Sequence, residues 1–142
     1  MWQDRRTADY CARLKADGHE TEIARRTGLL LDPYFSATKM RWLLDNEPTV
    51  RAASVTGRLA MGTVETWLVF KLTGGAHVTD ASNASRTSLL ALGGAGWDAG
   101  LCDLFGVEVP SGAHGRSLRP LLDGSASSIR EGALAGVWAR EG

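Results

Sequence analysis

The stretch Tyr34-Phe-Ser-Ala-Thr-Lys-Met-Arg-Trp-Leu-Leu-Asp-Asn46 decides the fold of this chain. Within it, Met40, Leu43 and Leu44 recur at helical spacing and make one apolar stripe. Pro48 follows shortly after the stretch and marks its end, because proline cannot continue a helix. The stretch therefore predicts an amphipathic helix whose apolar stripe faces a core.

Helical spacing and capping residues predict further helices on both sides of this stretch. The full predicted set covers residues 7–17, 20–26, 36–46, 48–56, 62–72 and 98–105. Thr7 and Thr63 stand where an N-cap is expected, at the start of helices 7–17 and 62–72. The apolar residues of helix 62–72 are expected to lie inside the protein, and they are Val64, Trp67, Leu68 and Leu72.

Two segments after residue 76 favour β structure. Residues 77–80 and 85–92 carry β-branched or alternating apolar positions and predict strands around a polar turn at 81–84. Helices mixed with strands indicate an α/β fold, although the strand content is low for a complete sheet. The sequence therefore predicts a helix-rich part of an α/β domain.

Length and charge limit the classes of function. The chain has 142 residues with 44% hydrophobic content, enough for one soluble domain. Lys plus Arg equals Asp plus Glu at 16 each, so a nucleic acid or an anionic membrane is not an expected partner. No apolar run reaches the roughly 18 residues of a membrane span. We therefore expect a cytoplasmic protein.

The two cysteines, Cys11 and Cys102, lie far apart without other ligands at metal-binding spacing. This spacing predicts neither a zinc site nor a disulfide framework. Free, partly buried thiols are the expected state of both residues.

Several motifs resemble those of one enzyme family. Lys39, Trp42 and Asp45-Asn46 on the predicted helix resemble a signature of the FGGY carbohydrate kinases. Three flanking motifs are similar to those of the glycerol-phosphorylating members, and they are Trp2-Gln-Asp-Arg-Arg-Thr7, Thr27-Gly-Leu-Leu-Leu-Asp-Pro33 and Thr79-Asp-Ala-Ser-Asn-Ala-Ser-Arg-Thr87. The resemblance spans residues 1–105 and implies part of the N-terminal, actin/ribonuclease-H-like domain of such a kinase.

The resemblance also implies a reaction and a substrate. FGGY kinases of this type transfer the γ-phosphate of ATP, with Mg, to glycerol or a related small polyol. By resemblance, Trp2 packs its indole against the polyol carbons and Tyr34 bonds a hydroxyl group. Both are therefore candidate substrate-binding residues, and a longer kinase chain upstream of residue 1 is expected.

Phosphoryl transfer requires groups that hold phosphate, metal and nucleophile. The chain has no phosphate-binding turn and no Gly-Asp-Gln base motif, and the glycines at 93–96 are interpreted as a turn. We therefore predict no catalytic, cofactor-binding or metal-binding residue here. Neither ATP nor Mg is expected to bind this chain well, and alone it is expected to be inactive.

Two polar clusters have structural interpretations. Asp80 and Asn83 are predicted to cap backbone groups in a turn, rather than to form a catalytic group with Ser85 and Arg86. The arginines at positions 5 and 6 are predicted to form salt bridges, with Asp4 or Asp9 as partners.

The composition changes after residue 105. Residues 106–142 are rich in Gly, Pro and Ser, and predict a loosely structured tail. Its motifs His114-Gly-Arg-Ser-Leu118 and Pro120-Leu-Leu-Asp-Gly124 resemble a non-catalytic segment of sulfatases. The formylglycine and calcium motifs of sulfatases are missing, so no sulfatase activity is predicted.

Two other roles remain open from the sequence. The chain is alternatively a non-enzymatic helical module that self-associates through exposed apolar surface. It is alternatively one half of a split kinase, completed by a separate chain.

Overall fold

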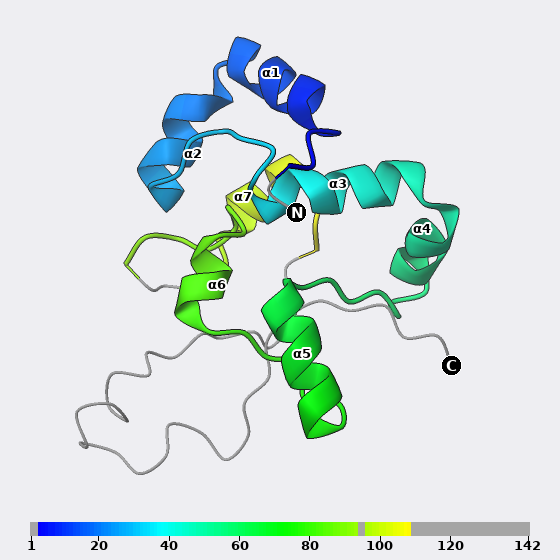
Figure 1. Ribbon diagram of the computed structural model, residues 1–142. Coiled ribbons are helices and arrows are strands. Elements are labelled where there is room, and N and C mark those ends of the chain that lie inside the picture. Colours follow the sequence, from blue (N-terminus) through cyan, green and yellow to red (C-terminus); the bar gives the residue numbers. More distant parts are fainter. Residues whose placement is uncertain (1–2, 94–95, 109–142) are drawn as a thin grey trace, which may run out of the picture.

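The computed structural model describes residues 3–93 and 96–108, and this part of the chain is mainly helical. Its helices are α1 (Ala8–Ala16), α2 (His19–Thr27), α3 (Ser36–Asn46), α4 (Pro48–Val55), α5 (Val64–Thr73), α6 (Ala81–Ser85) and α7 (Ala99–Phe105). Figure 1 shows α3 and α7 at the centre, with α1 above them, α2 to their left and α5 below. Every helix that the sequence predicted is present, with ends shifted by one or two residues at most.

The core lies where α2, α3 and α7 meet. Ile23 of α2 and Phe105 of α7 are fully buried, and Met40 and Leu44 of α3 join the same cluster. The predicted apolar stripe of α3 is thus confirmed as core at Met40 and Leu44, whereas Leu43 is only partly buried. Because these residues come from separate parts of the sequence, their burial fixes how the three helices sit together.

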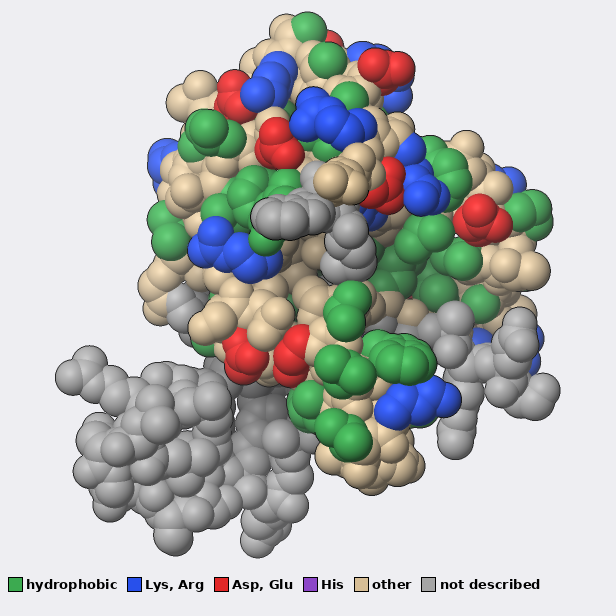
Figure 2. Space-filling view, in the orientation of Figure 1, with side chains coloured by type: hydrophobic (Ala, Val, Ile, Leu, Met, Phe, Trp, Pro, Cys, Tyr) green, Lys and Arg blue, Asp and Glu red, His purple; other side chains and the backbone are tan. Residues whose placement is uncertain are grey.

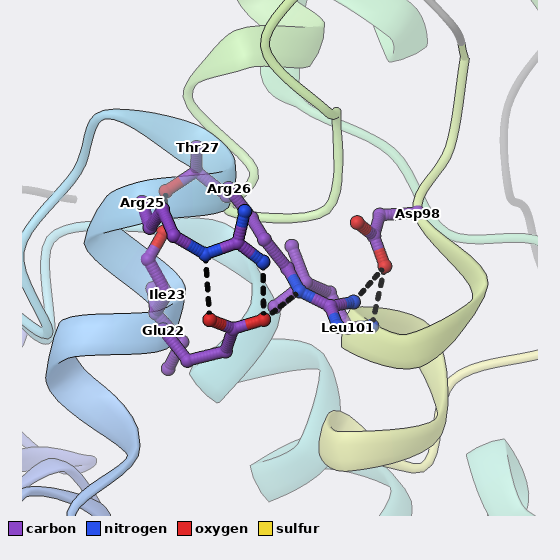
Figure 3. Close-up of polar contacts among 7 residues, drawn as sticks. All are labelled: Glu22, Ile23, Arg25, Arg26, Thr27, Asp98 and Leu101. Carbon is purple, nitrogen blue, oxygen red and sulfur yellow. Dashed lines mark hydrogen bonds and ion pairs between the residues drawn. The ribbon is translucent and has the colours of Figure 1, made fainter.

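An ion-pair network joins the end of α2 to the start of α7 (Figure 3). The Arg26 guanidinium donates from Nε to Glu22 Oε1 at 2.6 Å and from Nη1 to Asp98 Oδ1 at 2.7 Å. Asp98 also caps α7, because its carboxylate accepts the Leu101 backbone N–H at 3.0 Å. A Cβ atom at Gly100 would lie 2.6 Å from Arg26 Nη1, so the absence of a side chain there makes room for the guanidinium.

The same network holds Glu22 in its charged form. Hydrogen bonds from Arg25 and Arg26 lower the pKa of Glu22 from 4.5 to about 2. Because the pKa of Glu22 is lower in the folded state, the ionised carboxylate stabilises the folded protein at pH values above the ordinary pKa of 4.5. This stabilisation is lost as the pH falls toward 2.

Helix α5 is capped as predicted but is not buried as predicted. Thr63 and Thr66 form a capping box, and Gly74 ends the helix in a left-handed conformation. The residues expected inside are instead exposed: Val64 53%, Trp67 50%, Leu68 48% and Leu72 85%. Figure 2 shows these hydrophobic side chains gathered over α5. The apolar pattern was correct, but the described residues supply no surface to cover it.

The predicted strands are wrong for the described residues. Helix α6 covers residues 81–85, where a turn at 81–84 was expected, and the one β pairing among the described residues is an isolated antiparallel bridge between Leu90 and Trp97. Asp80 explains the helix, because its carboxylate accepts the Asn83 N–H at 2.8 Å and so caps the first turn. A strand also needs a neighbouring strand for its backbone groups, and residues 77–80 have none here.

None of the described helices combines the length and the apolar character needed to cross a bilayer.

Candidate functional site: the Tyr34 turn

Tyr34 lies on a tight turn between α2 and α3. The Tyr34 backbone N–H donates to Asp32 Oδ1 at 2.8 Å, and the Phe35 N–H donates to the Asp32 carbonyl at 3.2 Å. This geometry is an Asx turn, which the Asp-Pro pair favours. Pro33 is buried beneath the turn, whereas the Tyr34 side chain is 49% exposed. The turn thus fixes the backbone and leaves much of the Tyr34 side chain accessible.

The Tyr34 ring is also oriented by its neighbour. The rings of Tyr34 and Phe35 meet edge to face, with centroids 5.2 Å apart and planes at 87°. This is a favourable arrangement for two aromatic rings. Tyr34 is therefore about half exposed, with its ring in edge-to-face contact with Phe35.

The start of α3 is hydrogen-bonded to the backbone of residues 86–87. The Ser36 and Ala37 backbone N–H groups donate to the carbonyls of Arg86 and Thr87, at 3.4 and 2.8 Å. Two of the N–H groups that a helix leaves unpaired are thus satisfied from a distant segment. Ser88, which follows, is buried and has a left-handed φ of 63°, an uncommon conformation for a residue with a side chain.

The segment that follows Trp2 lies against the same helix. The buried Thr7 and Thr38 hydroxyls are 3.1 Å apart and hydrogen-bonded. Thr7 therefore does not cap α1 with its side chain as predicted, because its hydroxyl is used in this contact. Trp2 itself lies outside the described residues, so the structure neither places it nor tests its predicted contact with substrate.

The predicted salt bridge near the N-terminus is confirmed for one arginine. Arg6 Nε donates to Asp4 Oδ1 at 2.9 Å, and this contact, with the Arg6 backbone N–H, lowers the pKa of Asp4. The Arg6 guanidinium also stacks over the Trp42 ring, 4.6 Å from its centroid.

The polar cluster at residues 80–86 has a capping role. Asp80 accepts hydrogen bonds from the Asn83 backbone N–H and from Asn83 Nδ2, and these bonds lower the pKa of Asp80. The predicted capping by Asp80 is thus confirmed, although it begins a helix rather than a turn. Ser85 and Arg86 bond to each other, and the Ser85 hydroxyl donates to the Ser82 carbonyl.

Sequence analysis missed a carboxylate surrounded by threonines. Glu65 Oε2 accepts from the hydroxyl of Thr79 at 2.9 Å, and from those of Thr63 and Thr66 at 3.4 Å. No motif predicts this cluster, because Thr79 reaches Glu65 only through the tertiary fold. All three hydroxyls help to fix the start of α5.

A small cavity lies beside this cluster. Its lining includes Met40, Met61, Thr66, Leu89 and Trp97, and it encloses about 20 Å³. That is space for about one water molecule. Neither a polyol nor a nucleotide fits inside this cavity.

The cysteines are unsuited to nucleophilic chemistry. Cys11 and Cys102 are free and buried. Burial raises the pKa of the Cys11 thiol, and it raises that of Cys102 to about 11, with help from Asp98 and Asp103. Both thiols are therefore protonated at neutral pH.

Carboxylates and other metal ligands are not clustered in the part of the chain that the structure describes. Residues 3–93 and 96–108 contain no group of three or more His, Cys, Asp or Glu side chains arranged to hold a metal ion. These residues therefore do not provide a magnesium site by themselves.

Comparison with known proteins identifies the family. The N-terminal domain of the FGGY family of carbohydrate kinases matches residues 1–124. Glycerol kinase 1 from Pseudomonas aeruginosa is 53% identical in a match that covers 96% of this chain and 27% of that protein. Among solved structures, Plasmodium falciparum glycerol kinase with ADP has a TM-score of 0.70 at 36% identity, covering 75% of this chain and 21% of that one. Gluconate kinase from Lactobacillus acidophilus has a TM-score of 0.62 at 27% identity, covering 76% and 21%.

The chain thus spans about a quarter of the length of the curated relative described above. The family match also continues past residue 105, where the sequence analysis expected a change, as far as residue 124. The resemblance of residues 106–142 to a sulfatase stays a prediction and lies, beyond Glu108, outside the described residues. The conserved domain and the shared helical framework agree with the predicted fold class, and the chain belongs to the FGGY family of carbohydrate kinases, within its N-terminal domain.

Proposed function

We propose that this chain forms the polyol-contacting wall of a kinase that phosphorylates glycerol, with Tyr34 and Trp2 as substrate contacts. The observation that carries the proposal is the Tyr34 side chain, which is about half exposed although the turn beneath it is fixed by hydrogen bonds. The relatives named glycerol kinase support glycerol as the substrate.

The chemistry of the side chains suits a three-carbon polyol. The phenol of Tyr34 can donate a hydrogen bond to a glycerol hydroxyl or accept one from it. An indole at position 2 offers an apolar face to the C–H edges of the same molecule. Such a wall needs a second surface opposite it to enclose the substrate, because binding sites for small molecules are concave.

ATP and Mg are proposed for the whole kinase rather than for this chain. The described residues lack the carboxylate cluster that would hold the metal, so no step of phosphoryl transfer is assigned to them. We infer that the 142-residue chain alone does not phosphorylate glycerol. A cytoplasmic location belongs to the same proposal.

Exchange of this chain into a complete enzyme tests the role of Tyr34. We would replace the matching segment of Pseudomonas aeruginosa glycerol kinase 1 with this chain and measure steady-state kinetics with glycerol. Tyr34→Phe is expected to raise KM for glycerol about three- to tenfold, because one hydrogen bond contributes about 0.5–1.5 kcal/mol. A smaller change is expected in kcat, since the phenol contacts a hydroxyl and not the phosphate.

Tyr10→Phe is the matched control, because it removes the same hydroxyl group from α1, away from the Tyr34 turn. It should leave KM unchanged. An unchanged KM for Tyr34→Phe in an active chimera would remove Tyr34 from the substrate site.

A second role is favoured by the exposed face of α5. Val64, Trp67, Leu68 and Leu72 form a continuous apolar stripe on that helix, at the spacing of a buried face. The net charge of the chain is zero, so electrostatic repulsion does not oppose association. A second copy of this chain is the proposed partner of this stripe when no other part of a kinase covers it.

Introducing a charged side chain into the apolar stripe of α5 tests self-association. Trp67→Glu should weaken dimerisation at least tenfold, because it places a charge in the middle of an apolar contact. Sedimentation velocity over a range of concentrations measures the change. Val55→Glu, at a position that is 84% exposed on α4, is the control and should not alter the dissociation constant. A monomeric parent chain at high concentration would exclude this role.

A further inference from the structure

Two residues of the family-like signature stay within their own helix, and two reach out of it. Asp45 pairs with Arg41, and the Asn46 side-chain amide donates to the Trp42 carbonyl at 2.8 Å, so both act inside α3. Lys39 and Trp42 instead contact segments that precede the helix. The side-chain contacts therefore divide the four signature residues into two pairs with different structural roles.

Lys39 holds the residue that carries the exposed phenol. Its ammonium Nζ donates to the Tyr34 backbone carbonyl at 3.0 Å. On the other side of the same residue, the Tyr34 N–H is held by Asp32. Both backbone polar groups of Tyr34 are thus bonded to side chains of the turn and of α3, and not to a helix or sheet ladder. Removing the ammonium would release one of these two restraints.

Trp42 holds the segment that follows Trp2. The Arg6 guanidinium lies over the Trp42 ring at 4.6 Å, and Arg6 also pairs with Asp4 at 2.9 Å. One turn earlier on α3, the Thr38 hydroxyl bonds that of Thr7. Residues 4–7 are therefore fixed to the same helix that holds the Tyr34 turn.

The two sets of contacts meet at the start of α3. The Lys39 ammonium is near enough to Asp4 to contribute to the lowered pKa of that carboxyl. One helix thus holds both the Tyr34 turn and residues 4–7.

We propose that Lys39 and Trp42 are positioning residues, which fix the Tyr34 turn and the segment after Trp2 in one geometry. The inference rests on the proposed function for the role of Tyr34 and Trp2 in substrate binding. The positioning itself is a statement about this chain and is testable without catalysis.

Fluorine NMR of the full 142-residue chain labelled with 3-fluorotyrosine tests the Lys39 contact. The chain has two tyrosines, Tyr10 and Tyr34, and Tyr34→Phe assigns their signals. Lys39→Met should shift or broaden the Tyr34 signal and leave the Tyr10 signal in place. Lys39→Arg should restore at least half of the shift, because a guanidinium can also donate to the carbonyl.

Lys71→Met is the matched control, since it removes an ammonium from the exposed α5 instead. A Tyr34 signal that responds equally to Lys39→Met and Lys71→Met, or to neither, would overturn the Lys39 assignment. If Lys39→Met unfolds the chain, Lys39→Leu serves as the variant without a donor, and the Tyr34 signal of Lys39→Arg should lie closer to that of the parent chain than the signal of Lys39→Leu does.

Glycerol added to the parent chain gives a separate result. A shift of the Tyr34 signal with glycerol supports the proposed substrate contact, whereas an unchanged signal counts against that contact alone. The response to Lys39→Met without glycerol is independent of this outcome. Failure of the positioning role and failure of the proposed function are therefore distinguishable.

Hydrogen exchange tests the Trp42 contact. The Ala8 backbone N–H donates to the Arg5 carbonyl at 2.9 Å and so reports on the segment after Trp2. Trp42→Leu should speed its exchange at least tenfold relative to the Cys102 amide of α7, whereas Trp67→Leu should not. Equal exchange in both variants would overturn the Trp42 assignment.

Discussion

Replacement of Phe105 by alanine is expected to lower the free energy of unfolding by about 3–5 kcal/mol. Phe105 is 0% exposed and lies in the cluster that joins α7 to α2 and α3. Its removal loses the transfer free energy of a whole ring and leaves a cavity that the surrounding helices fill only in part. Because a domain of this size is stable by only about 5–15 kcal/mol, this single change removes a large share.

Urea denaturation followed by circular dichroism measures this loss. We expect a lower midpoint urea concentration and an unchanged dependence of the unfolding free energy on urea concentration. Val55→Ala is the control, since it also shortens an apolar side chain but at a position on α4 that is 84% exposed. We expect that control to stay within about 0.5 kcal/mol of the parent chain. Similar losses in both variants would mean that the helices do not share the core described above.

Replacement of Arg26 by methionine is expected to cost about 1–3 kcal/mol. Methionine keeps much of the apolar stem but cannot pair with Asp98, whose side chain is only 17% exposed. The Asp98 carboxylate is then left with the Leu101 N–H but without its cation, in a place with limited access to water. The loss should appear in the same denaturation experiment.

Arg25 provides a matched control for this change. It also pairs with Glu22, but its side chain is 69% exposed, and Figure 3 shows its dashed contacts running to Glu22 and not to Asp98. Arg25→Met should therefore cost less than about 1 kcal/mol, as exposed salt bridges do. Adding Asp98→Asn to Arg26→Met should recover part of the loss, because asparagine keeps the cap without the charge. Equal costs for Arg25→Met and Arg26→Met would contradict the link between α2 and α7.

Family resemblance suggested Tyr34 and Trp2 as substrate contacts, and both assignments stay predictions, whereas the geometry around Tyr34 could not be predicted from the sequence. The structure places Tyr34, about half exposed, on a turn that its backbone N–H helps to fix by donating to Asp32. Nothing in the local sequence showed that Lys39 would hold the Tyr34 carbonyl. Side-chain contacts of this kind depend on the directions in which a helix projects its residues from a docked start.

The sequence by itself predicted every described helix except α6, because spacing, caps and stop residues act within a few positions of one another. Helix α3 and the capping box of α5 follow from such local signals. Only the tertiary structure decided which apolar faces are covered, so the stripe of α5 was expected inside and is exposed. It also decided against strands at residues 77–80 and 85–92, since a strand requires a partner that local sequence cannot supply. Burial and strand pairing are properties of two surfaces, and one segment of sequence encodes only one of them.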